Sequence, residues 1–226
     1  MIFYIRKSFI CSFCGEKHYN GLRLKNGFGI CDECDKAMPR TPAAGTFAGS
    51  PNVGYVISAL FYEGKVRDAI VRSKFKGWSG NCDVFAYIMR EYVKNFPHLS
   101  KFDMVIPVQL SKERLYERGF NQSQRLAKAI ADIAGIEYNE IALVKIRNNK
   151  RQSRLSEAER ILNVKGVYAA SQDVNGKRII LVDDIYTSGA TLEECAAAMK
   201  EAGAIEVIGV TLSVRYKKEK NMFLRY

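Results

Sequence analysis

The chain has 226 residues, 47% of them hydrophobic and 26% charged, a balance typical of a globular protein with a core and unlike that of a disordered chain. Its 35 basic and 24 acidic side chains give a formal charge of +11, which attracts polyanions but does not separate nucleic acid from a small polyphosphate. Residues 1–10 are too short for a membrane span and wrongly ordered for a signal peptide, so we expect a cytoplasmic protein without membrane insertion.

Four of the six cysteines form two CxxC pairs separated by sixteen residues. Two such pairs can direct four thiolates at one ion and close a tetrahedron, which leaves no position open for chemistry. We therefore expect a structural Zn²⁺ in a module spanning residues 1–38, with an iron–sulfur cluster or a redox pair as alternatives and His18 as a possible substitute ligand. The predicted zinc ligands are Cys11, Cys14, Cys31 and Cys34.

Proline and glycine punctuate residues 37–51, and this composition predicts a linker at 39–54. A strand is expected at 55–62, followed by a basic helix at 66–76. Apolar residues then recur at helical spacing over 83–96, which predicts a helix with one buried face.

Beyond residue 101 the chain alternates apolar strands with amphipathic helices, as parallel α/β sheets do. Gly135 is expected to end one helix, and Thr191 with Glu194 has the spacing of a capping box that starts another. The phosphate-site domain described below is assigned to residues 55–216, with a basic tail at 217–226. The expected strands are 102–108, 141–146, 166–170, 178–182 and 206–214, and the expected helices are 122–134 and 191–203.

Residues 179–191 form an apolar strand, two adjacent acids and a small hydroxyl-rich turn that leads into a helix. Such a turn lies at the carboxyl edge of a sheet, where a helix N-terminus favours phosphate. Gly189 lets the backbone approach the phosphate closely. Asp183 and Asp184 would then face sugar hydroxyls or Mg²⁺. The predicted donors and backbone of this anion cradle are Thr187, Ser188, Gly189, Ala190 and Thr191.

These thirteen residues resemble the signature with which type I phosphoribosyltransferases bind 5-phosphoribosyl 1-pyrophosphate (PRPP). Residues 61–68, 74–77 and 117–122, with Gln152, Arg160 and Asn163, further resemble the ComF family of competence-associated proteins. The resemblance covers nearly the whole chain. It implies an α/β fold, a type I phosphoribosyltransferase-like parallel sheet flanked by helices, with a small N-terminal zinc-ribbon-like module.

The resemblance also implies site residues. Asp183 and Asp184 would act as the catalytic acids, and the loop after the first domain strand would contact pyrophosphate together with Mg²⁺. The family commonly reads Pro-Val-Pro-Leu where this chain has glutamine at the third position. Basic residues between 146 and 166 match a mobile loop that closes on substrate, with disorder without closure as the alternative. The residues expected near pyrophosphate are Val108, Gln109, Arg114 and Arg118, although both arginines could instead solvate a helix start.

Two functions remain open from the sequence. One is transfer of the phosphoribosyl group to a nucleobase-like acceptor with release of pyrophosphate; glutamine-dependent amidotransfer is not expected, because no nucleophile elbow is present and Cys195 fits a helix core. The other is a module that binds single-stranded DNA during uptake, together with competence-machinery proteins, for which a PRPP-responsive regulator is a third variant. The alternating aromatic and basic residues at 61–78 suit base stacking, or else core packing. The predicted nucleic-acid contacts are Arg72, Lys74, Lys76 and Trp78.

Overall fold

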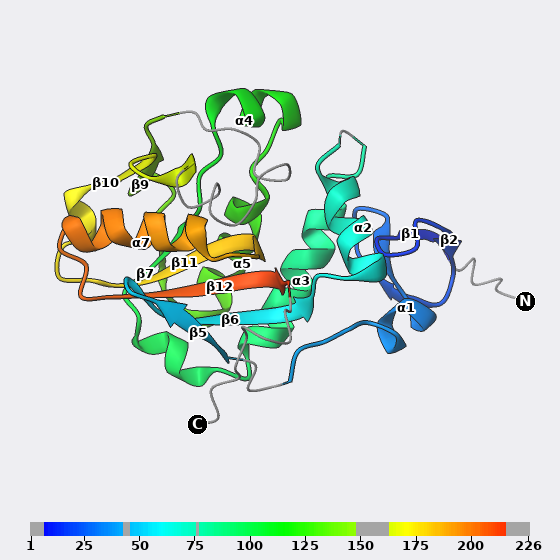
Figure 1. Cartoon of the computed structure of the whole chain (residues 1–226). Helices are drawn as coiled ribbons and strands as arrows, with labels where there is room; N and C mark the ends of the chain where they lie inside the picture. Colours follow the sequence, from blue (N-terminus) through cyan, green and yellow to red (C-terminus); the bar gives the residue numbers. More distant parts are fainter. Residues whose placement is uncertain (1–6, 43–45, 76, 148–162, 216–226) are drawn as a thin grey trace, which may run out of the picture.

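The computed structural model describes residues 7–42, 46–75, 77–147 and 163–215, and its centre is a six-stranded sheet (Figure 1). The strand order is β5-β6-β12-β11-β7-β8, with β5 antiparallel to β6 and all other neighbours parallel. The strands are β5 (Thr46–Ser50), β6 (Val53–Phe61), β7 (Met104–Pro107), β8 (Glu137–Tyr138), β11 (Arg178–Tyr186) and β12 (Glu206–Val214).

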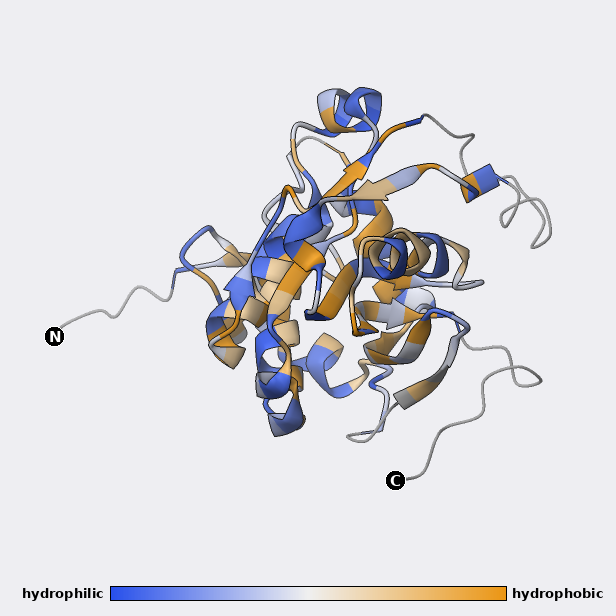
Figure 2. Ribbon diagram, turned by 90° about the vertical axis from the view of Figure 1, so that its left-hand side faces the viewer, coloured by the Kyte–Doolittle hydropathy of each residue, from blue (hydrophilic) through white to orange (hydrophobic). Residues whose placement is uncertain are grey.

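Helices cover both faces of this sheet. Helix α7 (Ala190–Glu201) packs on one face, and α5 (Gln122–Ala134) with α3 (Asn81–Val93) covers the other (Figure 1). Residues of β11 alternate between the layers, since Ile180 and Val182 join the α3/α5 core while Ile179 and Leu181 join the α7 core. Burial on both faces explains why this strand reads as an unbroken apolar run. Figure 2 shows the hydrophobic residues gathered along these inner strands.

Strands β7 and β11 are neighbours whose connections run to opposite sides. The chain leaves β7 through α4 (Lys112–Arg118) and α5 toward β8, and leaves β11 through α7 toward β12. Divergent connections open a crevice at the carboxyl ends of the two strands, the place where open α/β sheets bind ligands. The fold thus positions the loops after residues 107 and 186 around one crevice.

The N-terminal module packs directly on the main body. Its sheet has the order β2-β1-β4-β3, and the ring of Phe13 lies 6.1 Å from that of Phe85 on α3. Residues of the module share one buried cluster with α2 (Gly64–Ser73), α3 and α5. The module is therefore fixed against the domain. Its elements are β1 (Phe9–Cys11), β2 (Lys17–His18), β3 (Gly21–Arg23), β4 (Phe28–Cys31) and α1 (Asp32–Lys36).

Several sequence expectations need correction. The second half of the predicted linker is an edge hairpin, in which Ser50 pairs with Val53 around a two-residue turn, so its proline belongs to that turn. The segments 141–146 and 166–170 contribute β9 (Leu143–Lys145) and β10 (Tyr168–Ala170), which form a separate antiparallel pair outside the main sheet.

Helix boundaries differ in a similar way. Helix α7 begins at Ala190 with Gly189 as its N-cap, so the capping box at Thr191 and Glu194 was wrong; Glu194 instead accepts a hydrogen bond from the Gly166 amide. Gly135 does end α5, with φ of 68°. Within the described ranges the structure adds the short 3₁₀ helices η1 (Pro97–Lys101) and η3 (Gln172–Val174). Most of the predicted mobile loop and the tail at 217–226 lie outside the described residues.

Candidate functional site

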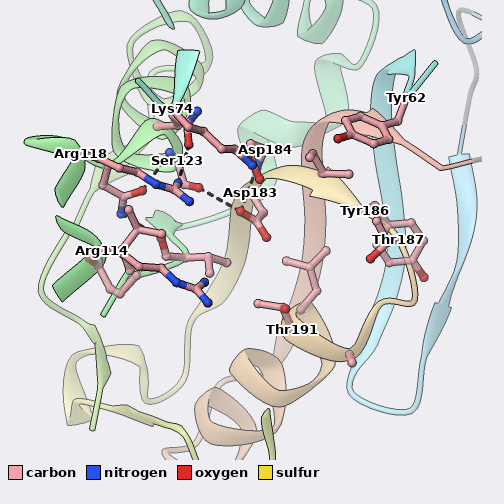
Figure 3. A pocket seen from close by; sticks show the side chains of 18 of the residues that line it. Tyr62, Lys74, Arg114, Arg118, Ser123, Asp183, Asp184, Tyr186, Thr187 and Thr191 are labelled. Carbon is pink, nitrogen blue, oxygen red and sulfur yellow. Dashed lines mark hydrogen bonds and ion pairs between the residues drawn. The ribbon is translucent and has the colours of Figure 1, made fainter. Parts of the chain in front are cut away.

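A cavity of about 760 Å³ lies at the carboxyl edge of β7 and β11 (Figure 3). Its walls come from the end of α2, the loop after β7, α4, the start of α5 and the turn into α7. Of the residues predicted for this site, Ser188 is not among the described residues that line the cavity, and its Oγ accepts a hydrogen bond of 3.5 Å from the Ala190 amide. The predicted residues that do line it are Val108, Gln109, Arg114, Arg118, Asp183, Asp184, Thr187, Gly189, Ala190 and Thr191.

The two adjacent acids have different partners in the cavity (Figure 3). Asp183 Oδ1 accepts hydrogen bonds from Ser123 Oγ at 3.0 Å and from the Asp184 amide at 2.8 Å. Asp184 Oδ2 lies 3.2 Å from Lys74 Nζ. Burial and the neighbouring Asp184 carboxylate raise the pKa of Asp183 to about 7. The pair therefore carries less negative charge at neutral pH than two ordinary aspartates would.

Positive charge exceeds negative charge along the cavity. Arg114 and Arg118 project from α4 on the side of Lys74 (Figure 3), and Arg118 Nη1 donates to Gln122 Oε1 at 3.0 Å. Burial, with the charge of Arg114, lowers the pKa of Lys145 to about 8. Such an excess of positive charge suits an anion with more than one phosphate group. Each guanidinium can bind two oxygens of a phosphate through two parallel hydrogen bonds. The six basic residues are Arg67, Lys74, Arg114, Arg118, Lys145 and Arg215, against the acids Glu117, Asp183 and Asp184.

The turn into α7 depends on a glycine. Gly189 has φ of +79°, and a β-carbon there would lie 3.0 Å from the ring of Tyr186. As the N-cap of α7 it supplies no side-chain cap of its own, and beside the contact of the Ala190 amide with Ser188 Oγ the helix start carries a partial positive charge. The geometry gives a phosphate direct access to the backbone at this turn.

The four predicted zinc ligands gather in the N-terminal module. Their Sγ atoms all lie within 4.8 Å of one another, with Cys11, Cys31 and Cys34 buried and Cys14 partly so. A tetrahedral zinc site with bonds of 2.3 Å places its sulfurs about 3.8 Å apart, so the cluster has the donors and spacing for the ion. The ring of His18 approaches Cys14 Sγ at 3.3 Å and supports that ligand from outside.

The predicted nucleic-acid residues that the structure describes lie at two places. Arg72 Nη2 donates to the carbonyl oxygens of Ser12 and Phe13, and its guanidinium lies 5.3 Å from the centre of the Trp78 ring. Trp78 in turn packs against Phe28 with 5.9 Å between ring centroids. Lys74 faces the cavity, and Lys76 lies outside the described residues. Two of the four thus contact the N-terminal module.

Several cavity residues were not expected from the sequence. Lys74 was assigned to nucleic acid, although its ammonium group lies beside Asp184. Ser123 comes from α5 and Lys145 from β9, so nothing near the signature in sequence indicates their position. Tyr186 lies inside the recognised motif, between the acids and the hydroxyl-rich turn. That position was the sequence signal that it lines the cavity.

No helix in the described ranges is long and apolar enough to cross a membrane. The profile of the phosphoribosyl transferase domain family matches residues 118–225. "Competence protein ComFC" of Bacillus subtilis (strain 168) is 30% identical over 205 residues, which are 90% of this chain and 77% of that protein. "DNA utilization protein YhgH" of Salmonella typhimurium (strain LT2) is 25% identical over 203 residues, 88% of this chain and 87% of that protein.

Among solved structures, the chain is similar to a glutamine phosphoribosylpyrophosphate amidotransferase from B. subtilis complexed with ADP and GMP. The identity is 27%, the superposition covers 57% of this chain and 26% of that one, and the TM-score is 0.36.

Proposed function

The chain belongs to the ComF family and carries a phosphoribosyltransferase-type domain, and on that basis we propose that it binds PRPP with Mg²⁺ through residues 183–191. One observation carries the proposal. Residues predicted separately, on the loop after β7 and on the turn after β11, line one cavity with three more basic than acidic side chains. A phosphorylated sugar with a pyrophosphate group matches that combination of cations, hydroxyls and acids.

Each part of PRPP has a matching part of the cavity. The 5-phosphate would accept hydrogen bonds from the turn at Gly189 and the start of α7. The sugar hydroxyls would donate to Asp183 and Asp184, and the pyrophosphate would lie against Arg114 and Arg118. Asp183 and Asp184 offer the carboxylate oxygens that Mg²⁺ prefers, and Mg²⁺ would supply charge neutralisation for the pyrophosphate.

A role in handling imported single-stranded DNA is the wider part of the proposal. It is supported by the printed names of the relatives, "Competence protein" and "DNA utilization protein". We place the protein in the cytoplasm, alongside competence-machinery proteins. Phe75, at the cavity rim and 63% exposed, is better placed than Trp78 to stack on an unpaired base.

The alternative is an active phosphoribosyltransferase with a nucleobase-like acceptor. The arrangement of side chains in the cavity supports this alternative. Tyr62 and Tyr186 lie on the side opposite Arg114 and Arg118 (Figure 3). An aromatic wall beside the sugar site would suit a flat acceptor. As the bond to pyrophosphate breaks, the negative charge that develops on the leaving pyrophosphate would be stabilised by Arg114 and Arg118.

The deciding experiment measures PRPP consumption alone and with a panel of nucleobases, beside calorimetric PRPP binding. Binding without turnover supports the binding module, and turnover with one base supports the enzyme. Absence of both binding and turnover would contradict the proposal as a whole.

A further inference from the structure

Helix α2 lies beside the N-terminal module (Figure 1), and residues at its C-terminal end line the cavity. Its first turn carries Lys65, whose Nζ is 3.5 Å from Cys34 Sγ. Its last turn carries Arg72, whose Nη2 donates to the carbonyl oxygens of Ser12 at 3.0 Å and Phe13 at 2.8 Å. One helix of ten residues therefore touches both halves of the cluster.

Arg72 contacts the loop that carries two of the four clustered cysteines. Ser12 and Phe13 are the two residues between Cys11 and Cys14, so their carbonyl oxygens belong to the loop that a bound ion would order. Zinc orders such loops because four thiolates converge only around the ion. With the loop ordered, its two carbonyl groups form a fixed acceptor for one guanidinium.

Trp78 adds a second contact between Arg72 and the N-terminal module. The Arg72 guanidinium lies over the Trp78 ring at 5.3 Å, and that ring packs edge-on against Phe28 of β4, the strand that ends at Cys31. The planar side chain of Arg72 is thus held by two carbonyl groups and one ring, which restricts its rotation. We call these contacts of Arg72 and Trp78 with the N-terminal module the joint. The joint fixes the position of the C-terminal end of α2.

The end of α2 is also a wall of the cavity. Val71, Lys74 and Phe75 line it, and Lys74, two residues after Arg72, forms the ion pair with Asp184. A shift of the helix end would move this ammonium group away from the acids and the ligand. Residues 72–74 therefore connect the loop between Cys11 and Cys14 with the cavity.

We propose that Arg72 is a positioning residue that couples the zinc centre to ligand binding in the cavity, by holding the end of α2, and with it Lys74, against the ordered Cys11–Cys14 loop. The proposal rests on the proposed function of the cavity as a phosphosugar site. Coupling of this kind is reciprocal, so a ligand in the cavity strengthens zinc retention by the same factor by which zinc strengthens the ligand.

The test uses the zinc-loaded full chain and ribose 5-phosphate as the probe. Arg72→Met is compared with Arg90→Met, an exposed arginine on α3 that does not line the cavity. We expect Arg72→Met to keep its zinc but bind ribose 5-phosphate at least about fivefold more weakly, the lower end of typical coupling, with Arg90→Met unchanged. Arg72→Lys, which keeps one donor group, should fall between them.

Two further readouts separate coupling from a purely structural role. Trp78 is the only tryptophan of the chain, so its emission reports on this joint and should change when ribose 5-phosphate binds. In the wild type, ribose 5-phosphate should also slow zinc transfer to a chelator, and that effect should vanish in Arg72→Met.

Three outcomes overturn the coupling. They are wild-type affinity in Arg72→Met, zinc retention that ignores ribose 5-phosphate in the wild type, and equal losses in Arg72→Met and Arg90→Met. A wild type that binds neither ribose 5-phosphate nor PRPP with Mg²⁺ contradicts the function of the cavity itself. If Arg72→Met does not fold, Arg72→Lys and the wild-type chelator experiment still decide.

Discussion

The cysteine cluster and the cavity both gather polar groups, but they differ in what is left exposed. The four thiols converge within 4.8 Å, three of them buried, and the groups around them are protein groups such as His18 and Lys65. The cavity instead leaves about 760 Å³ between an excess of cations and a pair of acids. A closed donor set indicates a structural role, whereas an open and charged one indicates a ligand. Substitutions at the two sites should therefore differ in kind.

The largest effect is expected at the closed site. Cys31→Ser should reduce zinc content from one ion per chain and lower the free energy of unfolding by more than about 4 kcal/mol, as loss of a structural metal does. Elemental analysis and denaturant unfolding measure both quantities. Cys195→Ala is the matched control, since Cys195 is buried in the α7 core away from the cluster and should keep full zinc. Full zinc occupancy in Cys31→Ser would rule out the four-ligand site.

The next effect concerns the joint between the two sites. Trp78→Ala removes the packing against Phe28 and Arg72, and should cost about 2–3 kcal/mol in thermal unfolding, below the range for a fully buried ring because Trp78 is only partly buried. Its losses of single-stranded and duplex DNA affinity should be equal. Phe75→Ala should instead weaken single-stranded DNA selectively, by about 1–3 kcal/mol, without changing stability. Strand-selective loss in Trp78→Ala alone would restore the sequence-based assignment.

A smaller effect distinguishes the turn at Gly189, which lines the cavity, from the turn at Gly119, which does not. Gly189 and Gly119 share φ of +79°, but a β-carbon at Gly119 would meet nothing within 4 Å. Gly119→Ala should therefore show only the left-handed strain of about 1–2 kcal/mol. Gly189→Ala should add the clash with Tyr186 and weaken PRPP binding as well. Equal thermal stabilities together with equal PRPP affinities would mean that the turn is not a phosphate site.

The smallest effect depends on pH. The folded-state pKa of Asp183, about 7, lies above the unfolded value of about 3.9, so the contribution of Asp183 to the free energy of unfolding should fall as pH rises from about 4 to 7. Asp183→Asn removes this cost and should be about 1 kcal/mol more stable than the wild type at pH 8, less than the full shift implies because water enters the cavity, with no gain at pH 4. Thermal unfolding at both pH values is the measurement. A variant that is less stable at pH 8 would contradict the raised pKa.

The sequence predicted most of the residues that gather in the cysteine cluster or line the cavity wherever those residues lie in one continuous segment. The strand, acids and hydroxyl turn of 179–191 follow one another along the chain, so their order already fixes their geometry. The same holds for each CxxC pair. Helix α4 was missed because none of its residues is buried, which leaves no apolar periodicity to detect.

The sequence could not resolve roles that depend on distant partners. Trp78 and Arg72 read as a nucleic-acid surface, yet their contacts are Phe28, Ser12 and Phe13, about fifty or more residues earlier in the chain. Aromatic and basic residues serve packing and binding equally well, so composition does not choose between them. Lys74 shows the converse, because only the folded chain brings it to Asp184.

Calorimetric titration of PRPP with Mg²⁺ tests most directly whether the cavity binds PRPP through its paired acids. The wild type should bind at one site, and Asp183→Asn with Asp184→Asn should bind at least about a hundredfold more weakly, since hydrogen bonds to charged groups contribute about 1.5–3 kcal/mol each. Asp132→Asn with Glu137→Gln removes two exposed charges outside the cavity and should leave the affinity unchanged. Unchanged affinity in the Asp183 and Asp184 double variant would contradict the account.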